Sequence, residues 1–258
     1  MLAKYSRKLL RRWIKAFLKS VGVYVFRAPP RGTDLTYDFR HALPHQPFHI
    51  IFDVGANIGQ SASWFLRDYA EACIWCFEPS AQLYAGLKNR YANNPRVTCE
   101  HCAIGSSGGE ATLIQTANSS MFHLSGNATV LPPGVTAIGS EGVRVMTLDD
   151  YCSRCGIDHV DFLKIDTEGH DLEVLRGAIG MLASNRVACV QCECSMNPEN
   201  KFHCAFEDIK DLLENFNYRL FGIYEQTQEV FESTPNLRRV DAVYISSDVI
   251  LTNPISVP

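Results

Sequence analysis

A glycine-containing turn flanked by acids follows a short apolar segment in the first third of the chain. Residues 48–52 are apolar apart from one histidine, and Asp53-Val54-Gly55-Ala56-Asn57-Ile58-Gly59 comes directly after them. Glycines at this spacing let the backbone turn tightly and approach a ligand without a Cβ in the way. A helix that begins after Gly59 would direct its free N–H groups and its dipole toward the same point. We therefore expect a nucleotide-binding turn at the end of the first strand of a parallel sheet.

The acids favour a cationic cofactor over a dinucleotide. The dinucleotide motif is G-x-G-x-x-G, whereas this turn reads D-x-G-x-x-x-G, and a carboxylate at Asp53 would repel a pyrophosphate. A second acid, Glu78, ends the next apolar segment, where an acid usually bonds ribose hydroxyls. The pair fits S-adenosylmethionine, with its sulfonium and amino group near Asp53 and its ribose at Glu78. An NAD-dependent dehydrogenase with an atypical motif is an alternative.

Three charged side chains lie where a later strand should end. Residues 160–166 form an apolar segment that carries Lys164 and Asp166 at its end, and Glu168 follows in a turn. In a doubly wound sheet the fourth strand lies beside the first, so all three should face the pocket described above. Burying a lysine beside carboxylates is expensive unless they pair, and close unlike charges tune pKa values. The group is either an acid/base cluster or an ion pair that only holds the turn.

The order of apolar and polar segments predicts an α/β fold, a Rossmann-like sheet of seven strands with helices on both faces. Strands are expected at 48–54, 72–77, 96–103, 160–166, 187–194, 218–224 and 240–246. Helices are expected at 57–69, 80–92, 148–156, 171–182 and 205–215. The last two strands are close together in the chain and should form an antiparallel hairpin.

An insertion at 106–147 interrupts this alternation. Residues 110–115 and 143–147 alternate like exposed strands and should pair, while residues 116–142 between them are polar and interrupted by Gly and Pro. Loops this long inside a compact domain are often functional. We expect it to close over the acceptor, and the domain itself to span 48–250.

The N-terminal residues 1–27 carry eight basic side chains and no acid, with apolar residues at helical spacing. They predict a basic amphipathic helix, and residues 28–47 a linker. Such a helix would lie on an anionic membrane surface; a mitochondrial presequence and a helix packed on its own domain are the alternatives. The rest of the chain is acidic, which argues against nucleic acid as a partner.

Cysteine usage is unusual. Eight of the ten cysteines form four C-x-x-C pairs, and this spacing taken alone indicates zinc binding. Three pairs lie in strand-like segments, where residues three apart point to opposite faces. Free cysteines acting as small hydrophobes are therefore favoured, and with them a reducing, cytoplasmic location.

One set of motifs points to a known family: its first two members are widespread, and the stretch from Leu148 to Ala178 is close to diagnostic. It consists of Phe52-Asp53-Val54-Gly55-Ala56-Asn57-Ile58-Gly59, Phe77-Glu78-Pro79, Ala103-Ile104-Gly105, Gly109-Glu110-Ala111, Leu148-Asp149-Asp150-Tyr151, Val160-Asp161-Phe162-Leu163-Lys164-Ile165-Asp166-Thr167-Glu168-Gly169 and Val174-Leu175-Arg176-Gly177-Ala178. Through them, residues 48 to about 220 resemble the FkbM family of S-adenosylmethionine-dependent methyltransferases. The resemblance implies a methyltransferase fold and O-methylation of a hydroxyl on a saccharide, glycan or secondary metabolite.

The resemblance also assigns cofactor residues. Those expected to hold the cofactor are Asp53, Gly55, Ala56, Asn57 and Gly59 at its methionine end, Glu78 and Pro79 at the ribose, and Cys102 and Ala103 at the adenine. His170 and Asp171 depart from the family's usual residues. His170 is expected to face solvent at a helix start, although it could add a proton acceptor.

For catalysis, we expect Asp166 to accept the acceptor's proton or to orient the group that does, with Lys164 steering its pKa and Glu168 placing the acceptor. A divalent cation shared by Asp53, Asp166 and Glu168 is conceivable, but no ligand spacing compels it. A non-catalytic, membrane-recruited protein with a methyltransferase-like fold is the remaining alternative.

Overall fold

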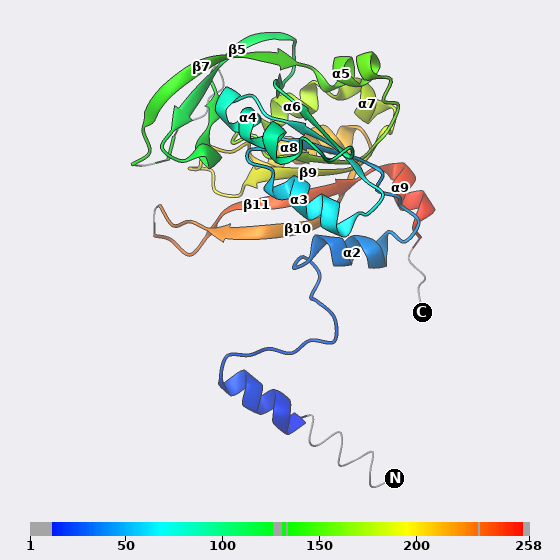
Figure 1. The fold of residues 1–258 in the computed structure, drawn as a ribbon. Coiled ribbons are helices and arrows are strands. Elements are labelled where there is room, and N and C mark those ends of the chain that lie inside the picture. The colour runs from blue at the N-terminus through cyan, green and yellow to red at the C-terminus, as the bar shows by residue number, and fades with distance from the viewer. Residues whose placement is uncertain (1–11, 126–130, 133, 232, 255–258) are drawn as a thin grey trace.

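The computed structural model describes residues 12–125, 131–132, 134–231 and 233–254. Its centre is a seven-stranded sheet with strand order β10-β11-β9-β8-β1-β2-β3 (Figure 1). The strands are β1 (Ile50–Val54), β2 (Cys73–Phe77), β3 (Val97–Glu100), β8 (Val160–Ile165), β9 (Val187–Ser195), β10 (Arg219–Gln228) and β11 (Leu237–Ile245). All neighbours run parallel except around β11, which is antiparallel to both β9 and β10. The α/β fold class and the antiparallel hairpin at the end of the sheet are thus confirmed.

Helices cover both faces of this sheet, as its two-sided burial requires. The helices are α2 (Leu35–Ala42), α3 (Gln60–Asp68), α4 (Ala81–Arg90), α5 (Leu148–Cys155), α6 (Asp171–Arg176), α7 (Ile179–Ala183), α8 (Phe206–Asn215) and α9 (Ser247–Thr252). One core forms between the sheet and α5 to α8, and a second between the sheet and α2, α3, α4 and α9. β1 and β8 lie side by side at the centre of the sheet, and their carboxyl ends are at the same edge. The strand order changes direction between these two strands.

The insertion builds a second, four-stranded sheet of β4 (Ala103–Ile104), β5 (Gly109–Thr116), β6 (His123–Leu124) and β7 (Ala137–Met146). β5 and β7 pair antiparallel as predicted, but β7 begins at Ala137, so the expected loop is shorter. A single turn, η1 (Ser119–Met121), lies within it. The expected strand 96–103 is wrong as one element, because the chain leaves the central sheet after Glu100 and β4 pairs with β7 instead.

The expected helix 171–182 is also two elements. α6 ends at Gly177, and a Cβ at that position would lie 2.0 Å from the carbonyl oxygen of Gly105. Only glycine allows the two backbones to approach this closely. The helix therefore breaks where it packs against the strand segment that enters the insertion.

The N-terminal assignments need two corrections. Residues 28–47 are not simply a linker, because they contain α2, whose buried Phe39 packs against Phe48 and Phe162. The helix in 1–27 occupies residues 12–20 and does not continue to 27; residues 1–11 lie outside the described residues. Among the described residues, no helix is long and apolar enough to cross a membrane.

The helix at 12–20 stands away from the body of the molecule (Figure 1). Trp13 is 74% and Phe17 67% exposed. The apolar side of this helix is therefore not covered by the domain, against the alternative in which it packs on its own fold.

Candidate active site

A cavity of about 220 Å³ opens at the carboxyl ends of β1, β2 and β8. Its floor is the turn after β1, one side is the loop after β8, and the other is the insertion. The insertion contributes Leu113, Ser119, Phe122, His123 and Leu124. The cavity thus lies at the topological switch point, the usual ligand site of this architecture.

The turn after β1 is shaped by close backbone contacts. Gly55 has φ of +86°, and a Cβ there would lie 1.9 Å from the carbonyl oxygen of Asp166. Asn57, also at positive φ, donates its N–H to Glu78 Oε2 at 2.8 Å, and Ser80 N–H donates to Oε1 at 2.8 Å. Burial raises the pKa of Glu78 to about 7, although the two backbone hydrogen bonds act to lower it. Each carboxylate oxygen keeps a second lone pair for a ligand hydroxyl.

Beneath the turn lies a buried ion cluster. Lys164 Nζ is 2.8 Å from Asp166 Oδ2 and 3.9 Å from Asp53 Oδ1. Burial raises the pKa of Asp53 to about 6, with Lys164 opposing it. Burial also acts to raise the pKa of Asp166, but the Lys164 ammonium outweighs it and lowers that pKa. Asp166 is therefore an ionised, weakly basic carboxylate.

Glu168 is the strained residue of the loop after β8. Its φ is +54°, a conformation that non-glycine residues adopt at a cost and that often marks functional sites. The loop is tied down by Asp171, which accepts hydrogen bonds from Thr167 and from the backbone N–H of Glu193 on β9. Burial raises the pKa of Glu168, and the nearby His203 opposes this.

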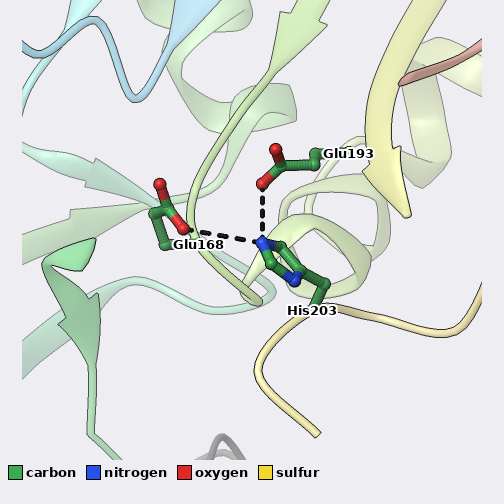
Figure 2. Close-up of side chains that lie close together, drawn as sticks. All are labelled: Glu168, Glu193 and His203. Carbon is green, nitrogen blue, oxygen red and sulfur yellow. Dashed lines mark ion pairs between the residues drawn. The ribbon is translucent and has the colours of Figure 1, made fainter. Parts of the chain in front are cut away.

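Figure 2 shows Glu168 and Glu193 approaching the same nitrogen of the His203 ring from different directions. His203 Nε2 lies 2.9 Å from Glu193 Oε2 and 3.6 Å from Glu168 Oε2. Arg239 on β11 pairs with the other oxygen of Glu193. The loop after β8, strand β9 and the loop before α8 therefore bring two acids and a histidine together beside the cavity.

Most residues predicted for the site line the cavity. They are Gly55, Ala56, Asn57, Glu78, Pro79, Cys102, Ala103, Asp166 and Glu168. Asp53, Gly59 and Lys164 do not line it. The first and last are buried below the turn, and Gly59 packs against Leu87 and Tyr91.

The expectation that His170 faces solvent is wrong. Its side chain lines the cavity and lies against Gly105, and burial lowers its pKa. The sequence analysis also missed Glu193 and His203. An acid inside the mostly apolar strand β9 was the signal for Glu193, whereas nothing in the local pattern marked His203.

All ten cysteines are free, and six of them are buried. Cys189 and Cys192 pack into the cores on opposite sides of the sheet, as the alternation of a strand requires. Among the described residues, no cysteine belongs to a group spaced for metal binding. Of the four C-x-x-C pairs, Cys189/Cys192 is buried at both positions, whereas each other pair has one buried member and Cys73 and Cys155 are exposed. The interpretation of the pairs as core residues therefore holds only in part.

Comparison with known families decides the assignment. Residues 53–220 match the model of the methyltransferase FkbM domain. The chain belongs to this family. The matched segment runs from Asp53 to the start of β10 and so contains the whole cavity, the ion cluster and the insertion.

Three curated relatives extend the comparison. The methyltransferase sdnD of Sordaria araneosa is 31% identical over 56% of this chain and 65% of its own length. The 2-O-methyltransferase NoeI of Sinorhizobium fredii is 26% identical over 68% of this chain and 75% of its own. The hexuronic acid methyltransferase AglP of Haloferax volcanii is 24% identical over 58% and 59%. The chain thus spans about two thirds of the length of these relatives.

Proposed function

We propose that this FkbM-family protein is an S-adenosylmethionine-dependent O-methyltransferase whose acceptor is a hydroxyl of a saccharide or similar metabolite. The observation that carries the proposal is the cavity, which joins a glycine turn and Glu78 on one side to Asp166 and Glu168 on the other. The cofactor supplies a methyl group on a sulfonium, already a good leaving group. The protein therefore has to bind, align and remove one proton.

The cavity residues suit this cofactor. Glu78 faces the cavity with lone pairs to spare after its two backbone hydrogen bonds. Gly55 lets the turn after β1 pack directly against the backbone of Asp166, which holds the two walls of the cavity together. Asp166, kept ionised by Lys164, provides negative charge for a cationic group. Leu113 and Leu124 of the insertion add apolar wall.

Glu168 is the better proton acceptor of the two loop carboxylates. A general base works best when its pKa lies close to the working pH. Burial raises the pKa of Glu168, whereas Lys164 lowers that of Asp166. We assign removal of the acceptor's proton to Glu168 and orientation of the acceptor to Asp166. These are the reverse of the roles expected from the sequence.

The relatives support a hydroxyl-bearing acceptor. Those named for an acceptor or a position are a 2-O-methyltransferase, a hexuronic acid methyltransferase and a 31-O-demethyl-FK506 methyltransferase. A second cavity of about 690 Å³ lies beside the first, and the exposed side chains Lys201, Glu207 and Asp208 are part of its lining. Charged groups of this kind bind polyhydroxylated ligands through hydrogen bonds. This supports a sugar-containing acceptor.

The experiment is transfer of a labelled methyl group from S-adenosylmethionine to a panel of hexuronic acids and methyl glycosides. Glu168→Gln should lower kcat by about 10²–10⁴-fold, the usual contribution of a general base, with cofactor affinity retained. Asp166→Asn should raise the KM of the acceptor more than it lowers kcat. Cofactor binding without methylation of any acceptor would instead support the non-catalytic alternative.

The N-terminal helix supports a membrane-surface location. Its apolar residues are exposed, and Arg12, Lys15 and Lys19 lie between them. Basic amphipathic helices bind anionic lipid surfaces. The chain should float with phosphatidylglycerol vesicles and not with neutral ones, and Phe17→Glu should abolish this. Ile138→Glu, at an equally exposed apolar residue of the insertion, is the matched control; equal loss with both variants would contradict the location.

A further inference from the structure

The loop between β9 and α8 presents His203 rigidly. Asn197 Nδ2 donates to Glu229 Oε2 at 3.0 Å, and Arg238 bonds both oxygens of the same buried carboxylate. Phe202 is buried and meets the His203 ring edge-on, with centroids 4.9 Å apart. The His203 side chain is only 6% exposed. Its ring is therefore held from behind by a buried polar network.

Asn200 determines which ring nitrogen of His203 carries the proton. The N–H of Phe202 donates to Asn200 Oδ1 at 3.2 Å, and Asn200 Nδ2 lies 3.4 Å from the carbonyl oxygen of Arg238. These two backbone groups orient the amide. Its Nδ2 then donates to His203 Nδ1 at 2.9 Å. Since Nδ1 accepts, the neutral ring carries its proton on Nε2.

The proton on Nε2 faces two carboxylates (Figure 2). The nearer oxygen, Glu193 Oε2, lies 2.9 Å away, off the N–H axis, and has no well-aligned donor among the described residues. Glu168 Oε2 is 3.6 Å away on the other side. A small movement of either side chain gives the shared N–H an aligned acceptor. Glu193 is anchored by Arg239, so Glu168 is the partner that can adjust.

These three side chains also have the spacing of metal ligands, with their ligand atoms within 4.8 Å of one another. A metal ion would need a lone pair on His203 Nε2. Asn200 places a proton there instead, and turning its amide would break the hydrogen bond from Phe202. The cluster is therefore a hydrogen-bonded one.

We propose that His203 is a positioning residue of the transfer site. Fixed by Asn200 as the Nε2–H tautomer, it donates to Glu168 and keeps that carboxylate aimed between the two cavities. His203 lines the second cavity and Glu168 the first, so their contact marks the place where acceptor and cofactor meet. The kinetic part of this inference rests on the proposed function, whereas the tautomer and the contact do not.

Charged groups from four segments surround Glu168. They are Lys164 and Asp166 at the end of β8, Glu193 on β9, Arg239 on β11, and Asp171 at the start of α6. Burial and Asp166 raise the pKa of Glu168, while His203 and Arg239 lower it. Removing the His203 Nε2–H should therefore raise the pKa of Glu168, because one of the groups that oppose the effect of burial is lost.

The test is a pH titration of the Glu168 carboxyl carbon by ¹³C NMR in the full chain with S-adenosylhomocysteine. His203→Leu, which has no donor, should raise the Glu168 pKa by about one unit. His203→Gln, which keeps an N–H donor, should stay near the wild type. If methyl transfer is established, the acid side of the pH profile of kcat in His203→Leu should shift upward by the same amount as the Glu168 pKa. At pH values below that pKa, kcat should then be about tenfold lower than in the wild type.

A second measurement needs no variant. Histidine ¹⁵N shifts of the wild-type chain should show a protonated Nε2 and a bare Nδ1 for His203. A proton on Nδ1 would overturn the proposal, as would stoichiometric binding of Zn²⁺ or Mn²⁺ that removes the Nε2 proton. An unmoved Glu168 titration in His203→Leu would reduce His203 to a packing residue. Absence of any methyl transfer would count against the proposed function alone.

Discussion

At the scale of single residues, the site is a set of carboxylates whose surroundings separate their proton affinities. Glu78 and Asp53 have raised pKa values because they are buried, whereas Lys164 lowers that of Asp166. Groups pushed apart in this way can take different roles at one pH. Lys164 matters most in this arrangement because it lies between the buried Asp53 and the cavity-lining Asp166.

Replacing this lysine should therefore destabilise the protein. Lys164→Met leaves the buried Asp53 and the partly exposed Asp166 without a cation. Breaking a fully buried pair typically costs about 3–5 kcal/mol, and solvent at Asp166 should keep the loss near or below the lower end of that range. The loss in urea unfolding should be smaller at pH 5.5 than at pH 8, since Asp53 can then take up a proton. The double variant Lys164→Met/Asp53→Asn should recover part of it at pH 8. Equal losses at both pH values would show that lost packing, not charge, is responsible.

At the scale of elements, the sequence was informative where apolar segments end in charge. β1, β2 and β8 lie within one or two residues of their expected bounds, and with them the placement of Glu78, Asp166 and Glu168. The limits lay in tertiary packing. The break between α6 and α7 depends on Gly105, 72 residues before Gly177 in the chain, and no local pattern shows that contact.

This break gives a sharp prediction. Gly177→Ala would place a Cβ 2.0 Å from the Gly105 carbonyl oxygen, so the two segments must separate, at a cost of about 1–3 kcal/mol or more. Gly86→Ala is the matched control: Gly86 is exposed within α4 and has nothing within 4 Å of the added Cβ. It should gain about 0.5–1 kcal/mol from helix propensity. The measurement is the Tm of the two variants in thermal unfolding. Similar Tm values for both would contradict the close approach of Gly177 to Gly105.

The same limit explains the misplaced histidines. His170 was expected in solvent because it begins a helix, but the insertion closes over that helix start and brings it into the cavity. His203 reaches Glu168 only because the loop before α8 folds back over β9 and β11. Contacts between loops that are far apart in sequence leave no periodic signal.

At the scale of the whole molecule, the buried carboxylates should set how stability varies with pH. Asp53, Asp171 and Asp241 have pKa values raised to about 6, and Glu78 to about 7. Between pH 4.5 and 7 the folded chain then binds more protons than the unfolded one, so stability falls as pH rises through this range. His170, whose pKa is lowered, acts in the opposite direction as a single group.

Below about pH 4 the sign reverses, because Asp161, Asp166 and Glu229 have lowered pKa values and lose their contribution on protonation. The Tm of the ligand-free chain should therefore be highest at about pH 4–4.5 and decline toward pH 8. Differential scanning calorimetry across pH 3–9 measures this. A Tm that rises steadily from pH 5 to 8 would contradict the burial of these acids.

The central claim is that the cavity holds S-adenosylmethionine through Glu78. The most direct measurement is calorimetric titration of the full chain with S-adenosylhomocysteine at pH 6 and pH 8, with NAD as the control ligand. We expect micromolar binding of S-adenosylhomocysteine that is about tenfold tighter at pH 8, where Glu78 is ionised, and that is lost in Glu78→Ala. Binding of NAD instead, or no binding of S-adenosylhomocysteine at either pH, would contradict the account.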